Sequence, residues 1–211
     1  PVKSTPSSSL RPAKSLSSPA TLRIVSLVSG AVLALSVCNA FGAPEPFYEG
    51  LGKHRMEITA DSPKAKRYFN QGMAFLHGFN HAAASRSFRE ATKLDPECAM
   101  AHWAIALASG PHINFPLVPP PAAELAWKEL ELARKYAAGA SPLEKSLIDA
   151  LGARYANPQP EDRSPLDRAY ADAMRKVWQE NPGNADAGAL FAEAMMNLRP
   201  WDQWTPEGQE Q

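Results

Sequence analysis

Residues 65–96 read AKRYFNQGMAFLHGFNHAAASRSFREATKLDP, and two apolar stripes at helical spacing in this stretch decide the fold. The first stripe holds Tyr68, Phe69, Gly72, Phe75 and Leu76, and the second holds Ala84, Phe88, Ala91 and Leu94. Each stripe is too narrow to form a core by itself. We therefore expect two short helices that fold back on each other around a turn at residues 78–80 and bury the stripes together.

The spacing of the large and small residues is more specific than a helical hairpin. The relevant positions are Tyr68, Gln71, Gly72, Phe75, Ala84, Phe88, Ala91 and Pro96. Seven of these eight suit the tetratricopeptide pattern, and Gln71 replaces the usual Leu. The stretch therefore resembles the tetratricopeptide repeat (TPR) family. The resemblance implies an all-α, right-handed superhelical solenoid of antiparallel helix pairs.

Weaker copies of the same alternation follow along the chain. Helices are expected over 99–109, 123–137 and 141–155, from Ser164 onward, and over 185–198, and Ser141 to Glu144 has the form of a capping box. The repeat region thus spans 61–198 and holds about three and a half repeats with long loops inside the later ones. Its last helix has no partner, so we read 199–211 as a loop toward a helix that lies beyond this sequence.

The first 43 residues have the pattern of an export signal. They are rich in Ser and Pro, carry no acidic residue, and contain the apolar run 24–37 followed by small residues. This pattern predicts a signal peptide cleaved after Ala40 or Ala43, and hence a periplasmic or extracellular protein of an exported bacterial type with no stable membrane span after cleavage. Residues 44–60 are expected to form an extended lead-in.

Two other interpretations of this leader remain open. Residues 35–38 resemble a lipobox, which would place a lipid on Cys38, although Val37 is larger than that motif prefers. The Ser-rich, acid-free start also resembles an organelle transit peptide, but the uninterrupted apolar run fits export better.

Charge and cysteine content narrow the possible partners. Loss of residues 1–43 removes four basic side chains, leaving 18 basic and 22 acidic residues and a formal charge of −4. A mildly acidic protein lacks the basic footprint of a nucleic-acid-binding protein. After cleavage Cys98 is the sole cysteine of this sequence, so no disulfide within it is expected, and a buried thiol is favoured over a reactive one.

The resemblance implies a binding groove lined by the exposed side of each first helix. By matching spacing, the expected groove residues are Lys66, Phe69, Met73, His77, Met100, Trp103, Leu107, Asp149 and Glu193. Such a groove suits an extended or helical segment with an apolar anchor and a basic stretch. Phe69 and Met73 stand where carboxylate-clamp repeats carry Lys and Asn, which disfavours binding of a chaperone's C-terminus.

The long loops form a second candidate surface. The insertions at 110–121 and 156–165 and the segment 199–211 all follow first helices, so stacking places them on one edge of the solenoid. The expected loop-edge residues are His112, Asn114, Phe115, Trp201, Asp202 and Trp204. A competing interpretation is that the tryptophans form small satellite cores that hold their loop down.

The sequence gives little support for a catalytic function. No nucleophile elbow, phosphate loop or HExxH motif is present, and no acidic or imidazole base has an evident partner. Cys98 and His102 lie one helical turn apart, and the fold could bring His77, His81 and His112 near them in space, which keeps a copper or zinc site as an alternative. We expect a non-enzymatic protein- or peptide-binding scaffold without a cofactor. The alternative is a metal- or small-ligand-binding repeat protein that uses Cys98 and His102 or the loop edge.

Overall fold

Capping side chains and breaker residues set the helix boundaries. The computed structural model describes residues 44–202 and 204–209. Ser62 caps the first described helix, α2 (Pro63–His77), and Asn80 caps α3 (His81–Leu94). The turn at 78–80 places Phe79 at a φ of 57°, which reverses the chain within three residues. The hairpin expected from the 65–96 stretch is therefore present.

Five more α-helices follow. They are α4 (Ala99–Ala108), α5 (Pro120–Tyr136), α6 (Pro142–Gly152), α7 (Ser164–Glu180) and α8 (Ala185–Asn197), with a short 3₁₀ turn, η1 (Ala137–Gly139), after α5. The capping box at Ser141 and Glu144 forms as expected. Helix α6 ends three residues earlier than expected because Arg154 and Tyr155 leave the helix to hold a loop. The described part of the chain is all helical, which confirms the all-α class.

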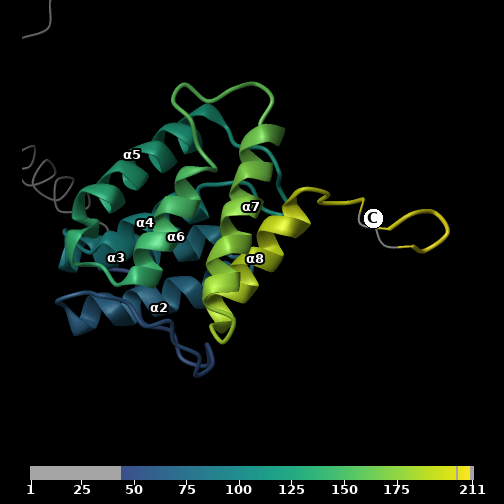
Figure 1. Cartoon of the computed structure of the whole chain (residues 1–211). Helices are drawn as coiled ribbons and strands as arrows, with labels where there is room; N and C mark the ends of the chain where they lie inside the picture. The colour runs from purple at the N-terminus through teal and green to yellow at the C-terminus, as the bar shows by residue number, and fades with distance from the viewer. Residues whose placement is uncertain (1–43, 203, 210–211) are drawn as a thin grey trace, which may run out of the picture. The chain divides into compact units, whose positions relative to one another are not determined.

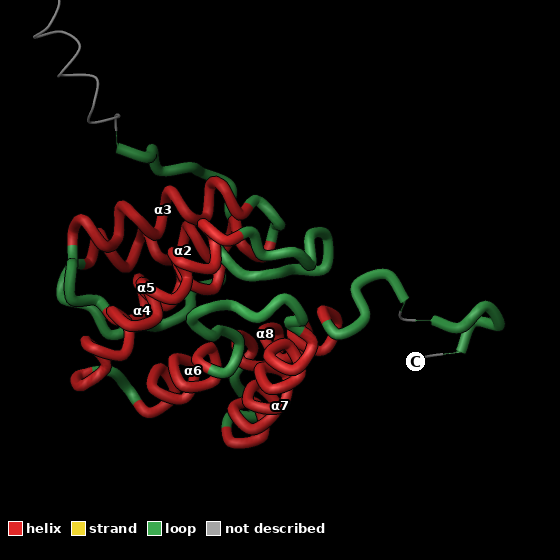
Figure 2. The backbone as a smooth tube through the Cα atoms, turned by 90° about the horizontal axis from the view of Figure 1, so that it is seen from above, coloured by secondary structure: helices red, strands yellow, loops and turns green. Residues whose placement is uncertain are grey.

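Consecutive helices pack side by side (Figures 1 and 2). The closest neighbours are α2 with α3, α4 with α5, and α7 with α8, while α2 also touches α4 and α4 touches α6. Between α2 and α3, Gly72 leaves room for the Phe88 ring, which lies 5.8 Å from the Phe69 ring. Helix α4 is buried on all sides from Ala99 to Ala108 and forms the centre of the core.

Residues 45–60 of the lead-in have no helix or strand and run along α2 (Figure 1). The Tyr68 hydroxyl donates to the Glu45 carbonyl at 2.7 Å, and Asn70 exchanges hydrogen bonds with the Met56 backbone. Further on, the Thr59 backbone N–H donates to the Glu144 carboxylate at 2.6 Å. The segment therefore joins the first helix pair to the start of α6.

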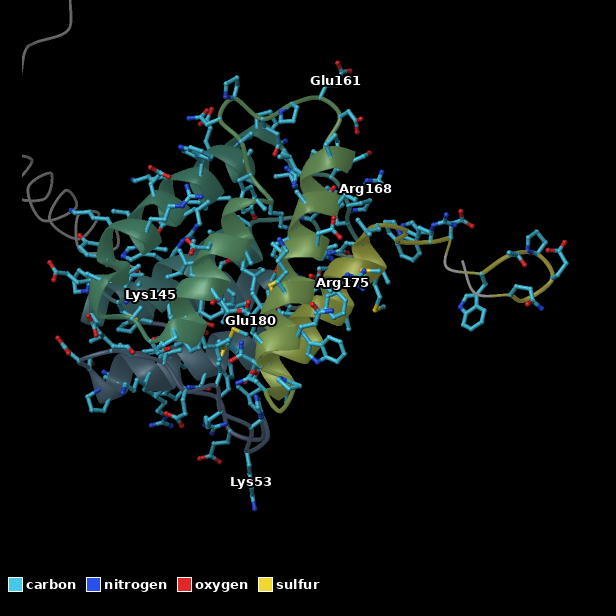
Figure 3. The ribbon with its side chains drawn as sticks, in the orientation of Figure 1. Lys53, Lys145, Glu161, Arg168, Arg175 and Glu180 are labelled. Carbon is cyan, nitrogen blue, oxygen red and sulfur yellow. The ribbon has the colours of Figure 1, made fainter. Side chains whose placement is uncertain are left out.

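Charged side chains spread over the outside of the helices. Lys145 on α6 and Arg168 and Arg175 on α7 are exposed and labelled in Figure 3. Among the described helices, none has the length and apolarity that a membrane span requires. The expected signal peptide, its cleavage at Ala40 or Ala43, and the alternative lipid on Cys38 all lie outside the described residues.

Candidate functional site

Five of the expected groove residues lie in the core instead of on an open surface, and one of them, Leu107 at 5% exposed, also borders a pocket. Phe69 and Met100 have no exposed surface, Trp103 is 1% exposed and Met73 is 3% exposed. The Trp103 indole N–H also donates to the Leu147 carbonyl of α6 at 3.1 Å. The expectation that these side chains line an open groove is wrong, because α2, α4 and α6 pack closely enough to cover this face.

The other expected groove residues have different positions. Lys66 is half-buried on α2, and Asp149 is exposed on α6. His77, Leu107 and Glu193 line one common pocket, together with the loop-edge residue His112. The structure thus joins parts of the two surfaces that the sequence suggested separately.

This pocket lies between the C-terminal ends of α2 and α4 and the middle of α8. Its volume is about 300 Å³ and its lining is mostly apolar. Alongside the four residues just named, its walls hold Leu76, Phe79, His81, Pro111, Ile113, Arg154, Ala189, Leu190, Ala192 and Met196. A preformed apolar hollow with a few polar groups is the usual form of a small-ligand or side-chain site.

Two stacked histidines form one wall of the pocket. The rings of His81 and His112 lie 3.9 Å apart and nearly parallel, and the exposed ring of Phe79 flanks them. Burial, together with the neighbouring His81 and Arg154, lowers the pKa of His112 to about 4. Burial also lowers the pKa of His81, so both imidazoles are neutral near pH 7. The Nδ1 atom of His112 is buried and has no hydrogen-bond partner.

Arg154 supplies a buried positive charge. Its side chain is 1% exposed, its Nη2 donates to the Pro111 carbonyl at 2.8 Å, and its guanidinium lies over the Tyr170 ring at 4.4 Å. The Glu193 carboxylate is 3.8 Å away, which is an ion pair but too long for a hydrogen bond. Burial is the largest single influence and opposes the charge of Arg154, but the combined fields of Glu193, Tyr170, Tyr155 and Asp167 outweigh it, so the pKa of Arg154 is raised.

Two loops hold this arrangement in place. The Gln159 amide donates to the Val118 carbonyl at 2.9 Å, so the loops after α4 and after α6 lie side by side as their common edge predicted. The Tyr155 hydroxyl donates to the Ala106 carbonyl at 2.6 Å, and Arg163 donates to the Arg154 carbonyl at 3.0 Å. The backbone at Arg154 is therefore held by the anchored Tyr155 side chain next to it and by the hydrogen bond to its own carbonyl.

The remaining loop-edge residues lie outside the pocket lining. Asn114 and Phe115 are exposed, and the Phe115 backbone pairs with that of His112. Trp201 is 74% exposed and Trp204 is 58% exposed, which contradicts the idea that they form satellite cores. Asp202 is also exposed, and the segment after α8 leads away from the helices in both views (Figures 1 and 2).

Cys98 and His102 serve the core in this structure. Both ring nitrogens of His102 have partners, with Nδ1 2.6 Å from the Glu129 carboxylate and Nε2 3.0 Å from the Pro96 carbonyl. The Cys98 thiol donates to the Thr59 carbonyl at 3.6 Å, and burial raises its pKa to about 11. A thiol of this kind is not ionised at neutral pH. Among residues 44–202 and 204–209, no group of three or more His, Cys, Asp or Glu side chains is placed to hold a metal ion.

Arg154 and Met196 are among the pocket residues that the sequence did not single out as site candidates. Met196 is an ordinary apolar residue of α8 and Arg154 is an ordinary basic residue just after α6, and nothing in their local pattern marks them. The available signal was the repetition of histidine at two first-helix ends, His77 and His81 in LHGFNH and His112 in GPHIN. Comparison with protein-family models, with curated proteins and with solved structures finds no match to this chain.

Proposed function

We propose that this chain is an exported binding protein of the tetratricopeptide type, whose helix pairs form a right-handed solenoid and whose pocket receives an apolar group of a protein or peptide partner. The order of contacts supports the architecture. Successive helices pack in pairs, and the first helices of neighbouring pairs, α2 with α4 and α4 with α6, also touch. Stacking of this kind is how repeat proteins build a continuous core.

The observation that carries the binding role is the pocket itself. It brings together His77, Leu107 and Glu193, which the repeat spacing assigned to a groove, with His112 from the loop edge. A hollow of about 300 Å³ accommodates one large side chain or a small molecule. Its mostly apolar walls favour an apolar anchor, in keeping with the segment expected from the sequence.

The leader and the charge define the setting of this proposal. An N-terminal export signal places the partner outside the cytoplasm, and the acidic balance of the remaining chain disfavours nucleic acid. The surface tryptophans after α8 provide further apolar area for a partner.

The test fills the pocket without cutting into the core. Ala192 lies on α8, is exposed and lines the pocket, so Ala192→Phe places a ring in the hollow. Peptides selected by display against the unmodified chain should lose at least ten-fold in affinity for this variant.

The matched control is Ala169→Phe, because Ala169 is an exposed helical residue outside the pocket lining. This variant should bind the selected peptides as the unmodified chain does. Equal affinities for both variants would remove the pocket from the binding site.

A further inference from the structure

The chemistry of the pocket is asymmetric in charge. Arg154 contributes a permanently charged group from within the core, whereas the histidines of the wall are neutral near pH 7. The one acidic residue of the lining is Glu193, whose side chain is 30% exposed. The positive guanidinium of Arg154 is therefore buried, whereas the negative carboxylate of Glu193 is accessible to solvent.

Arg154 is incompletely satisfied by the protein. A guanidinium has five N–H donors, and here the Pro111 carbonyl accepts one hydrogen bond while Glu193 lies beyond hydrogen-bond distance. The Nε atom of Arg154 is buried without a partner, as is Nδ1 of His112 in the same pocket. A buried donor without an acceptor is rare and costly, so the unpaired Nε–H of Arg154 points to a ligand that brings an acceptor oxygen, while Nδ1 of the neutral His112 ring donates or accepts according to its tautomer.

The rest of the hollow specifies the body of that ligand. Phe79, Leu190 and Met196 contribute apolar surface, and the volume of about 300 Å³ exceeds that of a single benzene ring with a short chain. A cationic ligand would be repelled by Arg154 and would compete with it for the single carboxylate of the lining, Glu193.

We propose that the pocket binds a small organic acid, with its apolar body against α8 and the Phe79 wall and its carboxylate on Arg154, where it displaces Glu193 as the counter-ion. The inference rests on the proposed use of this pocket for binding, and it adds the charge and class of the ligand. A carboxylate suits the planar donor fork of arginine better than any neutral acceptor.

Three probes of one shape test the charge preference. Phenylacetate, phenylacetamide and phenethylamine share the same ring and linker and differ in the charge of the polar group. Calorimetric titration of the full chain should show phenylacetate binding at least ten-fold more tightly than the amide, with the amine weakest. Equal binding of all three probes, or preference for the amine, would overturn the carboxylate assignment while leaving the pocket as a binding site.

Two acid-to-amide substitutions, one inside the pocket and one outside it, distinguish a local effect on the pocket from an effect of the protein's net charge. Glu193→Gln keeps an oxygen that can accept the amide hydrogen bond from Asn197, and it removes the competing carboxylate. It should strengthen phenylacetate binding at least three-fold. Asp172→Asn on the exposed surface of α7 makes the same charge change outside the pocket and should leave the affinity unchanged. Weaker binding in Glu193→Gln would contradict the proposed competition.

A third variant, at Arg154, keeps the positive charge and removes the planar guanidinium with its paired N–H donors. Arg154→Lys should lower phenylacetate affinity about ten-fold and leave phenylacetamide affinity nearly unchanged. If this variant fails to fold, the Glu193→Gln result still decides the proposal, because it changes the pocket without touching the buried arginine.

A last pair of probes identifies the source of the acid. The tetrapeptide Ala-Ala-Gly-Phe with a free C-terminus carries the same ring and carboxylate at a chain end, and its amidated form lacks the charge. Binding of phenylacetate without binding of either peptide would assign the site to free organic acids. Tighter binding of the acid peptide than of its amide would assign it to chain ends and support the same chemistry. Failure of every probe to bind would overturn this inference, whereas the proposed function is decided separately by the comparison of Ala192→Phe with Ala169→Phe.

Discussion

The core of the helical region and the pocket beside α8 differ in how tightly they are packed and in whether their buried histidine nitrogens have hydrogen-bond partners. In the interior, a Cβ on Gly72 would overlap the Phe88 ring, and both nitrogens of His102 have partners. At the pocket, about 300 Å³ is unfilled and buried nitrogens of His112 and Arg154 lack partners. The contrast separates residues that hold the fold from residues that are available to a ligand.

The two histidines make the contrast measurable. His102→Ala removes a buried ring and leaves the Glu129 carboxylate and the Pro96 carbonyl without their partner, so we expect a loss of about 3 kcal/mol in the free energy of unfolding. His112→Ala removes a half-buried ring that stacks on His81, and should cost less than about 1 kcal/mol. Urea unfolding followed by helical circular dichroism measures both. Similar losses for the two variants would erase the distinction.

Added volume gives a second, smaller contrast. Gly72→Ala gains about 1 kcal/mol of helix propensity, but the new methyl overlaps the Phe88 ring, so we expect a net loss of about 1–2 kcal/mol. Gly188→Ala is the matched control, because its Cβ would meet Trp178 at an ordinary 3.5 Å. This control should raise the free energy of unfolding by about 0.5 kcal/mol. A stabilised Gly72→Ala variant would show that the hairpin interior has room to spare.

The pH dependence of stability should differ in sign between the two histidines. The pKa of His112 is lowered to about 4, so below about pH 6.5 the unfolded chain binds a proton more readily than the folded one. Stability is therefore lost as pH falls from about 6.5 toward 4, by about 1 kcal/mol for His112 after solvent screening. His81 and Arg154 face the same ring and reinforce the effect.

His102 acts in the opposite direction. Burial alone would lower its pKa, but hydrogen bonds to Glu129 and to the Pro96 carbonyl outweigh burial and raise it. Its contribution is complete below about pH 6.5 and is lost as the pH rises through its folded-state pKa. His112→Phe should flatten the acid side of the unfolding profile relative to the unmodified chain, and His102→Gln should flatten the alkaline side. Profiles of unchanged slope in both variants would contradict these environments.

The sequence predicted the helices better than the site. Periodicity and capping residues placed the hairpin, the turn at 78–80 and the capping box of Ser141, because those features depend on residues close together in the chain. The prediction of an open groove was wrong because sequence spacing shows which face of its helix Phe69 or Trp103 occupies. Spacing does not show whether a neighbouring helix covers that face.

The pocket could not be predicted from sequence spacing, because it is formed by segments that are far apart in the chain. Its walls come from α2, α4, α8 and two loops, and Arg154 reaches it only because α6 ends at Gly152 and Tyr155 anchors the following loop on α4. All of these separate segments must be placed before the hollow exists. Only the histidines near the ends of first helices signalled it in advance.

The measurement closest to the central claim follows the imidazole resonances of the five histidines while phenylacetate is added. Two-dimensional proton–carbon spectra resolve each ring, and single His→Gln variants assign them. The account predicts that the signals of His77, His81 and His112 shift together with one saturation curve, and that those of His102 and His54 stay in place. Shifts confined to His102 or His54, or no shift in any ring, would contradict the assignment of the pocket as the binding site.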